Sequence, residues 1–148
     1  MTIPRALTPL LLALGLLAAG CGPEAPVHEL VQAAGGEISI PLSRVGDGEV
    51  HFFTYRHDGK NVNFLIRTDG SGKLQAHLDA CFSCYRYRRG YVVEGDDLVC
   101  IACRLAYSTE DEVWDFIGAC APISVHSTIE ANSLVIKDRL LVRAAKYF

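Results

Sequence analysis

The cysteines between residues 81 and 120 constrain this chain more than any other feature. Five of the six cysteines lie there. Four of them form two Cys-x-x-Cys pairs, Cys81 with Cys84 and Cys100 with Cys103, with fifteen residues between the pairs. Two residues between cysteines let one tight turn point both sulfurs at one ion, and two such turns joined by a hairpin complete a tetrahedron. The spacing therefore predicts that these four cysteines are metal ligands in a zinc-ribbon-like double knuckle.

The first twenty residues have the features of an export signal. Residues 6–19 form an apolar run that follows a start with one basic side chain, Arg5. This run is too short for a transmembrane helix, but it has the length of the apolar part of a secretory signal. Small residues lead directly into Cys21, as in the lipobox of bacterial lipoproteins, so we expect lipidation of Cys21. The alternative is a general signal peptide followed by a chance cysteine.

These features predict three segments. Residues 1–20 are a lipoprotein signal peptide, residues 21–36 are a tether containing proline and glycine, and residues 37–148 are one metal-binding domain. A short helix over residues 28–34 fits the pattern within the tether. Acyl chains would hold the domain on the membrane, so we expect it in the cell envelope, on the periplasmic or extracellular side.

Alternating apolar and polar residues predict a mostly β fold of the α+β class, a small antiparallel domain that ends in a short helix. The clearest hairpin joins residues 49–56 to 61–67 through an Asp58-Gly59 turn. Further strands are expected over residues 37–42, 74–80, 89–93, 98–99, 104–107, 123–130 and 133–136, and a helix over 137–147. The first knuckle thus begins where a strand ends.

Composition argues for one globular domain that has no nucleic-acid partner. The 148 residues are 50% hydrophobic and 21% charged, which is enough to bury one core. The formal net charge is -3 and no basic run occurs, so we expect no polyanion as partner. The sequence contains no recognisable Ser-His-Asp catalytic triad, no pair of carboxylates placed as general acid and base, and no phosphate-binding loop. The lack of these motifs favours a non-enzymatic role.

Three further groups of side chains are candidate site residues. Cys120 is either an additional ligand, a redox-active thiol or a small buried hydrophobe. His51 and His77 lie on separate predicted strands, where they form either a second metal site or two structural contacts. Arg86 and Arg88 alternate with tyrosines beside the first knuckle. They make either a basic rim that stabilises thiolate or the charged edge of a strand.

Several ordered motifs resemble the membrane iron–sulfur containing, FtrD-like domain family, which is associated with bacterial iron uptake. The matching segments are Ile40–Ser43, Gly48–Tyr55, Asp79–Tyr85, Gly90–Tyr91, Gly95, Cys100–Cys103, Gly118–Pro122 and Ala144–Phe148. The resemblance implies a metal or iron–sulfur centre on the four knuckle cysteines and a role beside an iron permease. Ala119 and Ala121 stand where the family pattern has glycine and asparagine. The membrane helices and ferredoxin-type motifs of many members are not found, so the chain looks like a lipoprotein version of the domain.

The knuckle cysteines either form disulfides or bind a metal ion or cluster, and the sequence is compatible with each state. Thiols of exported proteins tend to form disulfides, but a disulfide within one Cys-x-x-Cys closes a very small loop and constrains the unfolded chain little. Thiolates suit zinc, iron and cuprous copper. Iron–sulfur clusters are normally assembled inside the cell, and Arg5 alone is not a twin-arginine export signal. A zinc or mononuclear iron site, or one loaded with copper or iron after export, therefore fits an exported protein better than a cluster.

Three functions follow from these readings. The leading hypothesis is an accessory lipoprotein that uses its metal centre to pass metal or electrons to an iron permease. A second hypothesis is a module stapled by zinc or disulfides that recognises a partner protein. The third is a thiol oxidoreductase that uses one Cys-x-x-Cys pair together with Cys120.

Overall fold

A five-stranded sheet forms the centre of the computed structural model, which describes residues 25–114 and 120–148. Its strands, in spatial order, are β1 (Glu29–Val31), β3 (His51–His57), β4 (Lys60–Thr68), β5 (Leu74–Cys81) and β9 (Pro122–Val125). β1 runs parallel to β3, and the other pairs are antiparallel. Aromatic and β-branched residues fill β3 and β4, and the Asp58-Gly59 turn between them has positive φ at both residues, as a tight hairpin requires.

A second sheet and the C-terminal helix cover one face of this central sheet. The second sheet has the order β10 (Thr128–Glu130), β11 (Ser133–Lys137), β2 (Glu37–Pro41). A 3-10 turn (Leu42–Arg44) follows β2, and α1 (Asp138–Ala144) with a further 3-10 turn (Ala145–Tyr147) follows β11. The larger core lies between these elements and includes Ile38, Phe53, Phe64, Leu78, Ile136 and Leu141. Burial of each such side chain contributes roughly 1.5–3 kcal/mol.

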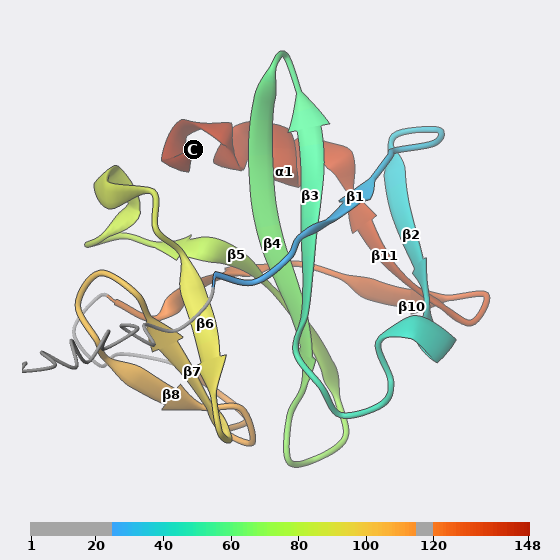
Figure 1. Ribbon diagram of the computed structural model, residues 1–148. Helices are drawn as coiled ribbons and strands as arrows, with labels where there is room; N and C mark the ends of the chain where they lie inside the picture. Colours follow the sequence, from blue (N-terminus) through green and yellow to red (C-terminus); the bar gives the residue numbers. More distant parts are fainter. Residues whose placement is uncertain (1–24, 115–119) are drawn as a thin grey trace, which may run out of the picture.

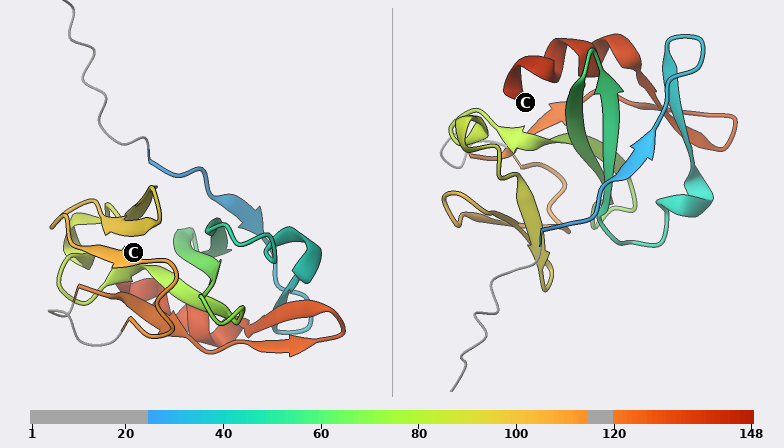
Figure 2. Two further views of the ribbon diagram at one scale, coloured as in Figure 1. Left: turned by 90° about the horizontal axis from the view of Figure 1, so that it is seen from below. Right: turned by 45° about the horizontal axis from the view of Figure 1, so that its top comes forward.

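A third sheet packs against the opposite face of the central sheet. It consists of β6 (Tyr91–Glu94), β7 (Asp97–Cys100) and β8 (Ala106–Ser108), and a 3-10 turn (Tyr85–Tyr87) connects β5 to it. Figures 1 and 2 show this sheet and the β2–β11–β10 sheet on opposite sides of β3 and β4. The smaller core between β6–β8 and the central sheet contains Phe52, Leu65, Tyr91, Leu98 and Trp114 together with Cys81, Cys100 and Cys120, and Cys84 packs against it. These four cysteines therefore lie in a hydrophobic layer, whereas Cys103 is exposed.

The prediction of a mostly β fold with antiparallel sheets and one short C-terminal helix is confirmed. Two local predictions outside the knuckles are wrong. Residues 29–31 form a strand and not a helix, because β1 pairs with β3, a partner that local periodicity does not reveal. The single strand expected over 123–130 is two strands in different sheets, with a break at residues 126–127. The predicted signal peptide and Cys21 lie outside the described residues.

Candidate metal centre

Four cysteine sulfurs converge on one point between the central sheet and the third sheet. The Sγ atoms of Cys81, Cys84, Cys100 and Cys120 all lie within 4.8 Å of one another. Cys120 Sγ is 3.5 Å from Cys81 Sγ and 3.5 Å from Cys84 Sγ. Cys81, Cys100 and Cys120 are buried and Cys84 is half-buried. The two knuckles are thus brought together, as their spacing predicts.

The first knuckle starts at the end of β5. Cys81 is the last residue of that strand, and the chain then turns so that the Cys84 backbone N–H donates to Cys81 Sγ at 3.1 Å. The 3-10 turn that follows carries the chain away from the sheet, and Arg88 ends this turn in the left-handed region at φ 50°. Residues 85–87 are therefore not the edge strand that the alternation of arginine and tyrosine predicts. Arg86 and Arg88 are both exposed beside the knuckle.

The second knuckle closes at the end of β7 in a similar way. The backbone N–H groups of Ala102 and Cys103 donate to the sulfur of Cys100. The Arg104 N–H donates to the Cys100 carbonyl at 2.9 Å, and Arg104 has φ 63°, which lets the chain reverse into β8. In both knuckles the first sulfur is thus an acceptor of backbone N–H groups. Such bonds stabilise a metal-bound thiolate and tune its electronic properties.

Cys120 belongs to the compact set, whereas Cys103 lies at its edge. Cys103 is exposed, and its sulfur is hydrogen-bonded with Cys84, Cys100 and Cys120. Cys120 reaches the centre because it lies two residues before Pro122, the first residue of β9, and Pro122 pairs with Cys81. The five cysteines of the described residues are free thiols in this structure. No Cys-x-x-Cys spacing includes Cys120, so the sequence signals for it are its position in the cysteine-rich stretch and the resemblance of Gly118–Pro122 to the family pattern.

The buried thiols resist ionisation. Burial raises the pKa of Cys84 to about 12, and burial also raises the pKa of Cys100 and Cys120. Cys103 differs: burial opposes its ionisation, but hydrogen bonds from the Cys120 thiol and the Leu105 backbone N–H outweigh burial and lower its pKa. A metal cation would have to displace protons from the buried sulfurs, so metal binding here would release protons.

The donor set fits a single metal ion. Four sulfurs at bond lengths of about 2.3 Å around one tetrahedral ion are about 3.8 Å apart. The separations in this structure, from 3.5 Å up to the 4.8 Å limit, bracket that value. Cysteines that bind different irons of a cluster must lie further apart than cysteines that share one ion. Because the donors are sulfur, zinc, iron and cuprous copper are the metals that the site suits.

The two candidate histidines are not brought together. His51 on β3 pairs with Ile66 on β4, and Ile66 pairs with Ala76 on β5. His77, the residue after Ala76, pairs instead with Leu65. The histidine side chains therefore point to opposite faces of the sheet. His51 Nε2 is 2.7 Å from Asp47 Oδ1 at the surface.

His77 is buried on the same face as the cysteine centre. Its ring lies 4.7 Å from the Trp114 ring, and its Nδ1 is 3.4 Å from Ser124 Oγ. Burial and, to a smaller extent, the Arg67 guanidinium lower the pKa of His77 to about 4. His77 is therefore neutral at physiological pH.

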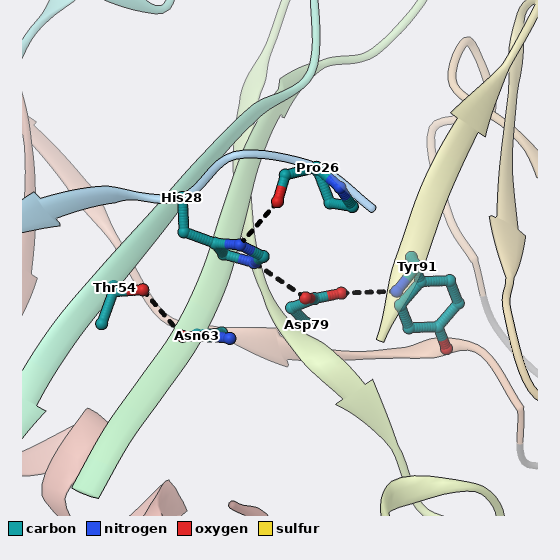
Figure 3. A network of polar contacts seen from close by, with 6 residues as sticks. All are labelled: Pro26, His28, Thr54, Asn63, Asp79 and Tyr91. Carbon is teal, nitrogen blue, oxygen red and sulfur yellow. Dashed lines mark hydrogen bonds and ion pairs between the residues drawn. The ribbon is translucent and has the colours of Figure 1, made fainter. Parts of the chain in front are cut away.

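A buried carboxylate next to the centre was not singled out by the sequence. Asp79 precedes Cys81 by two residues on β5, and its Oδ1 accepts the Tyr91 backbone N–H at 2.7 Å (Figure 3). Its Oδ2 is 2.9 Å from His28 Nε2, while His28 Nδ1 donates to the Pro26 carbonyl at 3.1 Å. The Tyr91 hydroxyl donates to the Cys120 carbonyl. Because a carbonyl oxygen only accepts, His28 Nδ1 carries hydrogen, and His28 Nε2 faces the Asp79 carboxyl group.

Comparisons with known proteins agree with the cysteine geometry. The sequence profile of the family described as "Membrane iron-sulfur containing protein FtrD-like" matches residues 45–148. No curated protein is significantly similar to the chain. Among solved structures, the crystal structure of the quaternary ammonium Rieske monooxygenase CntA with an inhibitor has 14% identity and a TM-score of 0.45, with 67% of this chain and 31% of that chain covered. A TM-score this low does not establish a shared fold.

Two further observations bear on where the protein resides and what it holds. The family is described as a membrane family, yet within residues 25–114 and 120–148 no helix is long and apolar enough to cross a bilayer. The family description and the four-cysteine cluster both support a metal or iron–sulfur cofactor. Since the profile covers most of the chain and includes all five clustered cysteines, the protein belongs to the FtrD-like family of membrane iron–sulfur containing proteins.

Proposed function

We propose that the protein holds one metal ion on Cys81, Cys84, Cys100 and Cys120 and serves iron uptake as an accessory protein of the cell envelope. The observation that carries this proposal is the convergence of the four sulfurs within 4.8 Å. The compactness of the set favours a mononuclear zinc or iron site over a cluster, although the family description names iron–sulfur. A bound iron would supply one-electron chemistry, and a bound zinc would supply only structure.

The residues around the proposed metal centre have different roles. The N–H groups of Cys84, Ala102 and Cys103 donate to sulfur and orient the two knuckles. Tyr91 ties the Cys120 segment to β6 through its hydroxyl group. Cys103, exposed beside the centre, and the arginines of residues 86–89 face solvent, where a partner can approach. An iron permease or an electron-transfer protein is the partner that the family's association with iron uptake favours.

Metal and sulfide analysis tests the proposal directly. The full chain is expressed in the organism that produces it and purified without oxygen, because overexpression elsewhere loads zinc by default. We expect about one zinc or iron per chain and no acid-labile sulfide, as a single tetrahedral thiolate site requires. Two or four irons with matching sulfide would show a cluster. Absence of metal together with oxidised thiols would overturn the proposal.

The contacts of Cys120 favour a second candidate, a dithiol–disulfide centre. Cys120 Sγ lies 3.5 Å from both Cys81 Sγ and Cys84 Sγ, so either bond could close with small movements. A thiol oxidoreductase would form one of these disulfides while its substrate disulfide is reduced to two thiols. Thiol counting under denaturing conditions and insulin reduction separate this candidate from the metal centre. Rapid insulin reduction by metal-free protein would favour the oxidoreductase.

Membrane attachment through Cys21 is a separate proposal that rests on the sequence before residue 25. Apolar residues followed by small residues and Cys21 support lipidation. Wild-type protein should fractionate with membranes and dissolve only in detergent, whereas the Cys21→Ser variant should not carry the lipid mass. A wild-type protein that mass spectrometry shows without acyl chains would contradict this proposal.

A further inference from the structure

The chain leaves little length between the proposed lipid anchor and the domain. Only residues 22–24 separate Cys21 from Ala25, the first residue that the structure describes. An extended chain advances by at most about 3.6 Å per residue, so the Cα atoms of Cys21 and Ala25 lie within about 14 Å of each other. A bilayer that holds the acyl chains of Cys21 would therefore lie close to the surface around Ala25.

The surface around Ala25 includes the turn of the first knuckle. His28 Nε2 is 2.9 Å from Asp79 Oδ2, and Asp79 Oδ1 accepts the Tyr91 N–H at 2.7 Å (Figure 3). Residues 25–28 therefore lie beside the end of β5 and the start of β6. The chain between these two strands forms the knuckle turn, residues 82–89. Its last two residues and residues 25–26 border one cavity of about 520 Å³, which places Ala25 and this turn on the same side of the molecule.

Apolar and aromatic side chains are exposed on these two segments. Val27 is 91% exposed, Phe82 is 57% exposed and Tyr87 is 68% exposed. Phe82 contacts Tyr147 edge-on, with 5.8 Å between the ring centroids, but more than half of its surface still faces solvent. Apolar side chains gain free energy when they enter the headgroup region of a bilayer, and tyrosine is favoured at that depth. These exposed side chains therefore suit a membrane-binding surface.

The same turn carries an excess of positive charge. Arg86, Arg88 and Arg89 are exposed, and among the described residues none of them forms an ion pair with a side-chain carboxylate. Residues 82–89 contain no acidic side chain. Residues 22–31 contain two, and one of them, Glu29, pairs with Arg44. Because the whole chain has a net charge of -3, these arginines concentrate positive charge on one side of an acidic protein.

We propose that one surface of the domain docks on an anionic phospholipid bilayer, and that this surface consists of Val27, Phe82, Arg86, Tyr87, Arg88 and Arg89. The arginines pair with lipid phosphates, and the apolar side chains enter the headgroup region. The proposal rests on lipidation of Cys21 and goes beyond it, because acyl chains hold the protein at the bilayer without fixing its orientation. Docking in this way places the turn between Cys81 and Cys84 next to the bilayer, where a membrane-embedded partner can reach the centre.

An acidic protein is the other kind of partner that three arginines could meet. The short chain before Ala25 favours the bilayer, because it keeps the bilayer near this surface whenever Cys21 is acylated. A protein partner would have to reach between the surface and the bilayer. Val27 adds to this preference, since it lies two residues after Ala25 and is almost fully exposed.

Hydroxyl-radical footprinting of the acylated wild-type protein tests the proposal, because the oxidised peptides report the exposure of single side chains. Protein purified from membranes is reconstituted into vesicles of phosphatidylcholine alone or of phosphatidylcholine with phosphatidylglycerol. Ile129 on β10, 54% exposed, is the internal reference, because the β10–β11 hairpin lies away from the blue segment before β1 in Figures 1 and 2. We expect oxidation of Phe82 and Tyr87, relative to Ile129, to be at least threefold slower on the anionic vesicles. High salt should remove this protection, because it screens the arginines.

Two triple variants separate docking through this surface from general attraction to anionic lipid. The first replaces the three cations of the turn and should abolish the protection: Arg86→Gln/Arg88→Gln/Arg89→Gln. The second removes the same charge from exposed positions on the β4–β5 turn, the end of β11 and α1, and should keep the protection: Lys73→Gln/Lys137→Gln/Arg139→Gln. Circular dichroism checks the fold of both variants. If the first variant does not fold, the salt dependence of the wild type decides.

The contradicting results are distinct from one another. In acylated protein, equal oxidation of Phe82 and Tyr87 on both kinds of vesicle would refute docking, leave the arginines for an acidic protein, and let the lipidation of Cys21 stand. Protection that high salt does not remove, or that both triple variants lose equally, would also refute docking through this surface. Wild-type protein that mass spectrometry shows without acyl chains would overturn the lipid attachment together with the docking. Metal analysis of the same samples tests the cysteine centre separately.

Discussion

Asp79 Oδ1 accepts the backbone N–H of Tyr91 at 2.7 Å, and this bond joins the strand that carries the first knuckle to the hairpin that carries the second. Asp79 lies on β5 two residues before Cys81, and Tyr91 pairs with Cys100 across β6 and β7. The carboxylate therefore fixes the distance between Cys81 and Cys100. His28 closes over the same carboxylate from the N-terminal side (Figure 3).

Removal of this carboxylate should weaken both the fold and the centre. In Asp79→Ala the buried Tyr91 N–H loses its acceptor, which costs roughly 1–3 kcal/mol of unfolding free energy. Asp79→Asn should be milder, because its amide oxygen can accept from Tyr91 while its NH₂ donates to His28 Nε2. Urea unfolding of the metal-free proteins and competition for metal with a chelator measure the two effects. Equal losses in both variants would show that the negative charge, and not the acceptor, matters.

Gly90 is required for the same contact. It has φ 65°, and a Cβ at this position would collide with the Asp79 carboxylate. Gly95, in the β6–β7 turn, has nearly the same φ of 63° but open space around it. Gly95→Ala should therefore cost only the left-handed backbone strain, about 1–2 kcal/mol. Gly90→Ala should cost clearly more and lower metal affinity as well. Similar unfolding free energies for the two variants would contradict the packing of Gly90 on Asp79.

Burial of His77 should make stability depend on pH. Its pKa falls from 6.5 when unfolded to about 4 when folded, so below pH 6.5 the unfolded state binds the proton more tightly. This contribution to stability is complete above pH 6.5 and is lost as the pH falls toward 4, by about 3 kcal/mol in total. Urea unfolding of metal-free protein between pH 7 and 4 should show a steeper loss for wild type than for His77→Gln. His126→Gln, at an exposed position, should behave like wild type. Identical pH profiles for wild type and His77→Gln would contradict the burial of a neutral imidazole.

In the proposed centre, four of the five cysteines of the described residues would hold the ion, and Cys103 lies at the rim. Cys120→Ser should lose at least a hundredfold in metal affinity, because a buried serine hydroxyl is a poor replacement for thiolate. Cys103→Ser should keep one metal per chain with a change below tenfold, since Cys103 is exposed outside the compact set. Chelator competition and metal analysis measure both variants. The reverse order would show that the two Cys-x-x-Cys pairs alone form the centre, as their spacing predicts.

The sequence predicts the parts of this site that depend on local pattern. Two Cys-x-x-Cys turns and a hairpin between them need only neighbouring residues, and the β3–β4 hairpin follows from alternation around Asp58-Gly59. Cys120 and His28 could not be placed in this way. Cys120 depends on the pairing of β9 with β5, and His28 depends on the parallel pairing of β1 with β3. Both pairings join segments far apart in the chain.

The histidines show how one residue of register decides a site. Thr68 pairs with Leu74 across the β4–β5 turn, which puts His77 opposite Leu65 and away from the face of His51. A slip by one residue would turn every side chain of β5 to the other face and place both histidines on the same side. Residues 69–73 are rich in glycine and serine and fix no single register in the sequence. Strand alternation alone therefore could not exclude a histidine metal site.

X-ray absorption at the edge of the bound metal measures the coordination shell directly. Protein purified without oxygen from its own organism should show four sulfur neighbours at about 2.3 Å and no second metal near the first. Cys120→Ser should change this shell, and Cys103→Ser should leave it unchanged. An iron neighbour just beyond the sulfur shell, or a shell dominated by nitrogen and oxygen, would contradict a single ion held by four thiolates.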